Sequence, residues 1–152
     1  MIFGEKIFPF LTTCFERNFK KRKVELLYAM NRTMIRSKSI SLPRESSDGI
    51  RICIMRKPPQ DSDYDIWIKD ISPSVEVLQA RHSDLMTFQE HRDWFEKHVF
   101  IDQSHLIDLL VTMAEKHIIT ILCIEEDPFK CHRSWVMAEI KKRRPDIQQL
   151  LA

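Results

Sequence analysis

Six side chains suited to chemistry lie within eleven positions of the sequence: Cys123, Glu125, Asp127, Cys131, His132 and Arg133. Together they offer two thiols, two carboxylates, an imidazole and a fixed cation. Thiols can act as nucleophiles or redox centres, imidazoles and carboxylates can carry protons, and a guanidinium can hold an anion. This mixture predicts a reactive site for a substrate that carries negative charge.

The residues around this cluster predict a strand followed by a helix. Residues 118–124 form an uninterrupted apolar or β-branched run, which is typical of a central strand buried on both faces. Asp127 suits a helix N-cap and Pro128 suits the first helical position, so we expect a helix from there to residue 144, closed by Pro145. Its expected buried stripe is Trp135, Val136, Met137 and Ile140.

The expected helix start would place Cys131, His132 and Arg133 in or near its first turn. Unpaired N–H groups and the positive end of the helix dipole favour a thiolate or a bound anion there. In open α/β sheets ligands bind beyond the carboxyl ends of the strands, where this turn would lie. We therefore expect Cys131 to act as a nucleophile or redox centre, with His132 or Glu125 as proton carrier and Arg133 as an anion-binding group.

Each assignment has a plainer structural alternative. Cys131 could be a small buried residue in a helix turn. Cys123 lies in the apolar run, where burial raises the pKa of a thiol, so we expect a core residue with a supporting role at most. Glu125 could be an exposed loop acid, and Asp127 is expected only to support the site.

A second predicted strand could bring further cations to the site. Residues 50–55 are largely apolar and are followed by Arg56 and Lys57. If this strand neighbours the central one, Arg56 and Arg133 could bind one anion together, with Arg51 as a further substrate-binding candidate. The alternative is ordinary charge at the edge of a strand.

The sequence predicts no metal and no cofactor. Cys123, Cys131 and His132 lack a fourth ligand with the spacing of a structural zinc site. Gly4 and Gly49 are the only glycines in the sequence, which excludes phosphate-binding and dinucleotide-binding glycine loops.

The composition fits one compact domain with an ordinary core. The chain has 152 residues, of which 43% are hydrophobic and 30% charged, and its net charge of +2 gives no electrostatic case for nucleic acid by itself. Four cysteines without the spacing of a disulfide scaffold predict free thiols and a cytoplasmic location. No apolar run approaches the roughly 20 residues that span a bilayer, and no signal-peptide cleavage pattern is found, so no membrane partner is expected.

Residues 1–29 differ from the rest in charge. They hold six basic residues against three acids, whereas the remaining 123 residues carry a net charge of about −1. We predict an extension over residues 1–29, solvated or with a basic surface patch, and a single domain over residues 30–152. A second hypothesis places the start of translation at Met30, because the run KKRKVE has purine-rich codons like a ribosome-binding site. The intact mass of the native protein tests it, and a species starting at Met1 would contradict it.

The remaining patterns predict further elements. Strands are expected at residues 33–40 and 146–151, and residues 64–71 are ambiguous. Helices are expected at residues 73–80 after a Ser-Pro start, from the Thr87 capping box, and at residues 104–116 with Leu106, Leu109, Leu110 and Met113 buried. This order predicts an α/β fold, a three-layer domain with a small, mainly parallel sheet and helices on both faces.

The run from Cys123 to Arg133, Cys-x-Glu-x-Asp-Pro-x-x-Cys-His-Arg, resembles the hallmark of the domain of unknown function 488 (DUF488) family. Asp48-Gly49-x-Arg51 before a strand ending in Arg56, together with residues 67–74, is similar to the YeaO-like branch. A Trp-Pro-Arg-Gly element of that branch is replaced by residues 57–60, Lys-Pro-Pro-Gln. The resemblance covers about residues 33–151. It implies an α/β fold with the Cys-His-Arg turn as its site, and no settled activity.

Two functions of different kinds fit these residues. The first is a cysteine-dependent enzyme acting on a phosphate- or carboxylate-bearing substrate. The second is a non-enzymatic module that binds a phosphate-bearing ligand or nucleic acid while the cysteines pack, and a purely structural protein is a third reading. A small anionic ligand is the expected partner, nucleic acid is a weaker one, and no oligomeric state is predicted.

Overall fold

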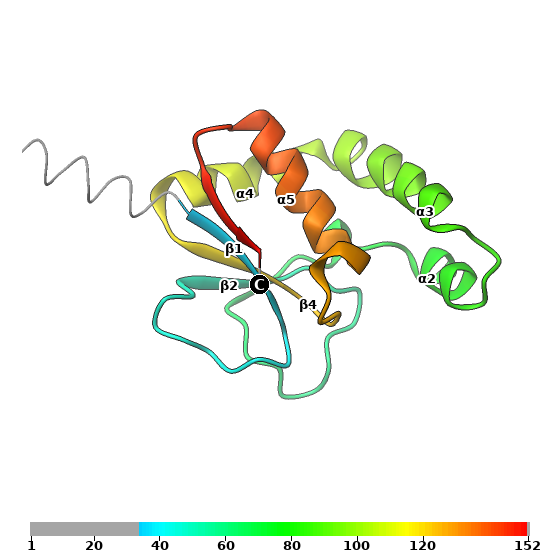
Figure 1. Cartoon of the computed structure of the whole chain (residues 1–152), viewed down its shortest axis with the longest axis horizontal. Coiled ribbons are helices and arrows are strands. Elements are labelled where there is room, and N and C mark those ends of the chain that lie inside the picture. Colours follow the sequence, from blue (N-terminus) through cyan, green and yellow to red (C-terminus); the bar gives the residue numbers. More distant parts are fainter. Residues whose placement is uncertain (1–33, 152) are drawn as a thin grey trace, which may run out of the picture. The chain divides into compact units, whose positions relative to one another are not determined.

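A single parallel sheet organises the part of the chain that the computed structural model describes, residues 34–151. The predictions for residues 1–29 and for Met30 lie outside it. Five strands run in the order β3-β2-β4-β1-β5, so β4 is central as predicted (Figure 1). The strands are β1 (Met34–Ser39), β2 (Ile50–Cys53), β3 (Ile66–Trp67), β4 (Ile119–Cys123) and β5 (Gln148–Leu151).

The helices follow the sequence signals closely. The Thr87 hydroxyl and the Glu90 carboxylate form the predicted capping box. The helix expected at residues 73–80 begins two residues later, because Ser74 rather than Ser72 caps it. Among the described residues, no helix is long and apolar enough to cross a membrane. The helices are α2 (Val75–His82), α3 (Phe88–Phe95), α4 (Ser104–Lys116) and α5 (His132–Arg143), with a π-helical segment, η2 (Glu96–Ile101), and short 3-10 turns, η1 (Lys69–Ile71) and η3 (Pro128–Lys130).

The register of β4 brings the ends of three strands to one edge. β1 and β2 pair with β4 on either side, and all five residues of β4 are buried because helices cover one face of the sheet there and loops the other. Cys123 lies opposite Ser39 at the end of β1, and Leu122 lies opposite Cys53 at the end of β2. Cys123 therefore sits at the carboxyl edge of the sheet, where α/β proteins hold their ligands.

The two faces of the sheet are covered differently. The α/β class and the parallel sheet are confirmed, but α3, α4 and α5 share one apolar cluster with Ile35, Ile52 and Ile121 on a single face. The other face has a small apolar cluster and is covered by the loops after β1 and β2, which extend below the sheet in Figure 1. The connections from β3 to β4 and from β4 to β5 move along the sheet in the same direction. Right-handed crossovers then place their helices on the same side, so loops take the place of the second helical layer.

The loop-covered face holds a buried ionic network. The Lys38 ammonium lies 3.2 Å from a carboxylate oxygen of Asp48, and Arg51 lies 3.9 Å from the other oxygen. The Thr120 hydroxyl donates to the Asp48 carbonyl at 2.6 Å. Arg51 is fully buried and donates to the Leu42 carbonyl, because its position in β2 points it away from the helices. Arg51, predicted to bind substrate, thus belongs to the interior of the fold.

Gly49 has a left-handed backbone conformation and a contact that leaves no room for a Cβ atom. Its φ is +63°, and an added Cβ would overlap the backbone of Ile118. Replacing it with alanine should destabilise the protein by about 2 kcal/mol or more, since both backbone strain and a clash are introduced. Urea unfolding measures this. Gly49→Asn serves as the comparison: asparagine tolerates positive φ, so a nearly harmless Gly49→Asn would contradict the role of the Ile118 contact.

The buried stripe of α4 differs by one position from the prediction. The buried residues are Ile107, Leu110, Val111 and Ala114, and Leu109 is 46% exposed. Both this stripe and the predicted one are apolar at helical spacing, so periodicity alone does not separate them. The packing of α4 against α5 and β1 selects the observed one.

Candidate functional site

The segment after β4 makes a short turn before α5 begins. An Asp127 carboxylate oxygen accepts the N–H of Phe129 at 2.9 Å and caps the 3-10 turn that starts at Pro128. Cys131 then adopts extended backbone, φ −122° and ψ 142°, and α5 starts at His132. The helix expected from Asp127-Pro128 is therefore interrupted, because one turn closes there and a second helix opens after Cys131. As a result Cys131 is the N-cap residue of α5, and His132 and Arg133 occupy its first turn as predicted.

Arg133 supports this turn from inside the protein. Its side chain is fully buried, and the guanidinium donates to the carbonyl of Glu125 and, at 3.0 Å, to that of Glu126. It does not line the pocket described below. The anion clamp with Arg56 that the sequence suggested is thus not formed, because these carbonyls hold the guanidinium within the fold. Its charge still acts on the nearby thiol of Cys123.

Two thiols and an imidazole converge beside this turn. The Cys123 Sγ lies 3.9 Å from His132 Nδ1, and the Cys131 Sγ lies 4.0 Å from the same nitrogen. The ligand atoms of all three residues lie within 4.8 Å of one another. Cys123, Cys131 and His132, predicted as site residues, are therefore brought together, and Cys123 is a full member of the group. We call these three residues the Cys–His cluster.

The ring of His132 is held in one orientation. Its Nε2 lies 3.1 Å from the carbonyl oxygen of Ile54, just after β2. A carbonyl only accepts hydrogen bonds, so Nε2 carries the proton in the neutral ring and Nδ1 presents a lone pair. Cys131 Sγ lies 4.0 Å from this Nδ1, whereas Cys123 Sγ lies 3.9 Å from Nδ1 and 4.0 Å from Nε2. The pairing of β2 with β4 thus sets the chemistry of the imidazole.

The two thiols of the cluster differ in acidity. A hydrogen bond from Cys131 lowers the pKa of Cys123 despite its burial, and the N–H groups of Ile124 and Glu125 and the charge of Arg133 act in the same direction. The pKa of Cys131 is raised by the same hydrogen bond and by burial. Burial also raises the pKa of the separate Cys53 thiol. The first thiolate to form in this cluster is expected on Cys123.

The cluster lines a pocket of about 730 Å³. Its walls come from the ends of β2 and β4, from α2 with the residues before it, and from the starts of α3 and α5. Of the other predicted residues, Glu125 and Arg56 also line it. A cavity of this size suits a small molecule.

Cations dominate the charged lining of this pocket, which holds a single acid, Glu125. Arg56 donates to the carbonyls of Ser72 and Pro73 at 2.9 and 3.1 Å, which fixes its guanidinium against the start of α2. Lys57 is exposed and makes no ion pair within residues 34–151. Arg56, Arg81 and Lys130 each lie 3.5 to 3.8 Å from an acid outside the lining, so Lys57 is the lining cation whose charge most favours an anionic ligand. The cations are Arg56, Lys57, Arg81 and Lys130.

His91 lines the same pocket and was not among the predicted site residues. Its ring packs edge-on against Trp135 at 5.1 Å, and its buried Nε2 has no hydrogen-bond partner among the described residues. One signal in the sequence points to it. His91 lies three residues after Phe88 and four before Phe95 in the capped helix, so the three share one helix face. Arg81 and Lys130 offered no comparable signal, because their positions depend on how α2 and η3 pack.

Burial makes His91 a source of acid sensitivity. Burial first, and then the nearby positive charges of His132, Arg81 and His82, lower its pKa from 6.5 to about 4. Between these two pH values the His91 imidazole binds a proton more readily in the unfolded chain than in the folded protein. The free energy of unfolding therefore falls as the pH drops from about 6.5 toward 4. The upper limit of this contribution is about 3 kcal/mol, from a pKa difference of about 2.5 at 1.36 kcal/mol per pKa unit. Urea unfolding at several pH values should show a weaker acid dependence in His91→Gln; an equal dependence in both proteins would contradict the assignment.

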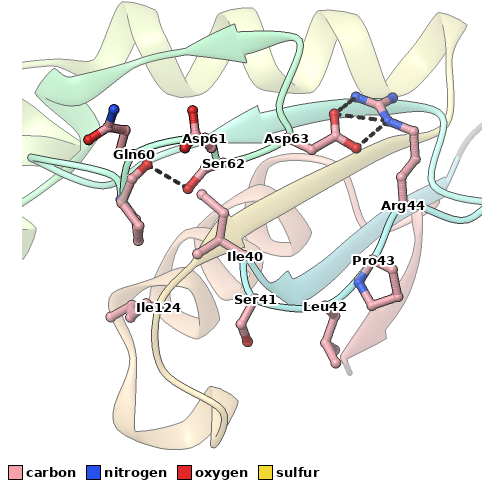
Figure 2. A pocket seen from close by; sticks show the side chains of 11 residues that line it. Ile40, Ser41, Leu42, Pro43, Arg44, Gln60, Asp61, Ser62, Asp63 and Ile124 are labelled. Carbon is pink, nitrogen blue, oxygen red and sulfur yellow. Dashed lines mark hydrogen bonds and ion pairs between the residues drawn. The ribbon is translucent and has the colours of Figure 1, made fainter.

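Another hollow, of about 490 Å³, lies beside Ile124 and lacks this chemistry (Figure 2). The Arg44 guanidinium donates to both carboxylate oxygens of Asp63, at distances from 2.7 Å, and its charge is thereby matched. No thiol or imidazole lines this hollow. The Cys–His cluster and its pocket therefore form the stronger candidate site.

Comparison with known proteins gives one match. The family model DUF488-N3a, described as the active DUF488-N3 subclade, matches residues 35–144, which contain the whole Cys–His cluster. No curated protein matches the chain, and no solved structure does. The YeaO-like branch stays a prediction, because this match does not test it.

Proposed function

The chain belongs to the DUF488 family, and we propose that it is a thiol-dependent enzyme acting on a small anionic substrate in the pocket that the Cys–His cluster lines. One observation carries the proposal: two thiols and an oriented imidazole meet in a small-molecule pocket whose charged lining is mostly cationic. Structural packing requires none of these groups together. A nucleophile, a proton carrier and an anion site are what such an enzyme needs.

The roles follow from the positions of the groups. Cys123 is the nucleophile, because Cys131 and two backbone N–H groups stabilise its thiolate. His132 takes up the thiol proton at Nδ1 and returns it to the leaving group; its distance of 3.9 Å from the sulfur leaves room to tighten when substrate binds. In this assignment Cys131, the nucleophile expected from the sequence, is the hydrogen-bond donor.

The substrate is held by the cationic rim. Lys57 and Arg56 lie at the end of β2, beside the end of β4, and supply positive charge close to the cluster. The pocket volume of about 730 Å³ favours a small phosphate- or carboxylate-bearing molecule over a nucleic-acid backbone, which needs an extended basic surface.

Protection from alkylation tests the anion site. Inorganic phosphate should slow the modification of Cys123 by iodoacetamide several-fold relative to chloride at equal ionic strength. Lys57→Gln should weaken this protection, whereas Lys97→Gln, an exposed lysine outside the pocket, should leave it unchanged. Equal protection in both variants would place the bound anion elsewhere.

A search for a covalent intermediate tests the chemistry. The reduced protein is incubated with a panel of small phosphate esters and carboxylate thioesters, and peptide masses are recorded. An acyl or phosphoryl group on Cys123, absent in Cys123→Ala, supports the proposal. Phosphate binding without any adduct or turnover across the panel, unchanged in Cys123→Ala, would favour the non-enzymatic binding module.

A further inference from the structure

The donor atoms of the Cys–His cluster have nearly the spacing of a metal site. In a tetrahedral zinc site, bonds of about 2.3 Å to sulfur and about 2.0 Å to nitrogen set the ligand atoms roughly 3.5–3.8 Å apart. The distances from His132 Nδ1 are 3.9 Å to Cys123 Sγ and 4.0 Å to Cys131 Sγ, and all three ligand atoms lie within 4.8 Å of one another. A small inward movement would complete the geometry around one ion.

The surroundings of His132 give an independent indication. Histidines that bind metals usually donate their other ring N–H to a carboxylate or backbone carbonyl, which fixes the tautomer and the ring plane. The bond from Nε2 to the Ile54 carbonyl at 3.1 Å does this and leaves Nδ1 as the ligand atom, with both sulfurs within 4.0 Å of it. All three residues line the pocket, so a fourth ligand would reach the ion from the pocket.

From this geometry we propose that Cys123, Cys131 and His132 bind one zinc-class divalent cation, with the fourth coordination position open to the pocket. Thiolates and a neutral imidazole are preferred zinc ligands, and three protein ligands with one open position distinguish reactive sites from closed structural ones. The sequence offers no fourth protein ligand, which argues against a structural zinc site. An open site requires this arrangement, because its fourth position is left for a ligand from the pocket. When the cation binds, both thiols lose their protons and the Cys123 sulfur becomes a ligand of the ion. A bound cation therefore suppresses the reaction of Cys123 as a nucleophile.

Metal titration of the full-length protein tests this site directly. The protein carries Cys14→Ser, because Cys14 lies outside the described residues, and is reduced and stripped with a chelator. Addition of Cd²⁺ should produce thiolate-to-metal charge-transfer absorption that saturates at one ion per chain, and Co²⁺ should give the visible bands of tetrahedral coordination. Competition with a chromogenic chelator then gives the affinity for Zn²⁺.

Single substitutions locate the ion. Cys123→Ser, Cys131→Ser and His132→Gln should each weaken Zn²⁺ binding by more than the roughly 10- to 100-fold that loss of an outer-shell partner costs. Cys53→Ala should have no effect, because Cys53 lies outside the cluster. Thermal unfolding controls for misfolded variants: Zn²⁺ should raise the Tm of the parent protein and of Cys53→Ala, but not that of a folded Cys131→Ser.

The result separates this site from the proposed thiol chemistry. Absence of charge-transfer absorption, or equal affinity in Cys131→Ser and the parent protein, overturns the metal site and leaves the alkylation of Cys123 in chelator unaffected. If iodoacetamide does not modify Cys123 in the presence of chelator, the role of Cys123 as nucleophile is overturned. The outcome of the metal titration does not depend on that result. Saturation with Zn²⁺ should reduce the alkylation rate of Cys123 at least about tenfold, in parallel with occupancy, and an unchanged rate at full occupancy contradicts ligation by Cys123.

Discussion

Iodoacetamide should modify Cys123 in the reduced, chelator-treated protein at pH 7 at least about tenfold faster than Cys131 or Cys53. The thiolate is the reacting form, and the pKa of Cys123 is lowered, whereas the hydrogen bond with Cys123 and burial raise the pKa of Cys131, and burial raises that of Cys53. Each unit of pKa changes the thiolate fraction about tenfold, and the weaker intrinsic reactivity of a more acidic thiol offsets only part of this. Peptide mass spectrometry over a time course measures the three rates.

Two substitutions of Cys131 separate the effect of its hydrogen bond to Cys123 from the effect of reagent access to Cys123. Cys131→Ala removes the donor that lowers the pKa of Cys123 and should slow its alkylation at pH 7 several-fold. Cys131→Ser keeps an O–H donor at the same position and should slow it less. If both substitutions have equal effects, or if Cys131 reacts first in the parent protein, the thiolate does not reside on Cys123.

Asp48→Ala should destabilise the protein by about 3–5 kcal/mol, the cost of removing one partner from a buried ion pair. Asp48 is fully buried, and its carboxylate faces Lys38 and Arg51, whose side chains are also buried. Alanine leaves these cations without their shared counter-charge beneath the loops after β1 and β2. Urea unfolding followed by circular dichroism measures the loss.

Glu45 provides the control for this network. It pairs with the same Lys38 at 3.3 Å, but its side chain is 56% exposed. Glu45→Ala should therefore cost no more than about 1 kcal/mol. A similar cost for both substitutions would mean that burial of Asp48 does not determine the effect.

The fold could be predicted well because its signals are local. The uninterrupted apolar run predicted β4 as the central strand, and the capping box predicted the start of α3. The bounds of α4 agree with the prediction, but its buried side does not, because two adjacent apolar stripes compete there. The covering of the second face by loops depends on the order of the strands, which no local pattern encodes.

The candidate site could be predicted only in part. The spacing from Cys123 to His132 predicted that thiols and imidazole lie near one another, and the structure brings them together. The positions of the Arg51 and Arg133 side chains could not be predicted, since an arginine in a strand or in the first turn of a helix can point outward or inward. Both turn inward to Leu42 and to the carbonyls after β4. Of the cations that do line the pocket, Arg56 was predicted, whereas Arg81 comes from α2, which is distant from the Cys–His cluster in the sequence.

Bridging by a trivalent arsenical tests the convergence of the two sulfurs most directly. Phenylarsine oxide joins two neighbouring thiols and releases one water, so the reduced protein should form a single adduct that links the Cys123 and Cys131 peptides. The adduct should vanish in Cys123→Ser and in Cys131→Ser and persist in Cys53→Ala. A link to Cys53, or no bridged peptide in the folded protein, would contradict a site built on Cys123, Cys131 and His132.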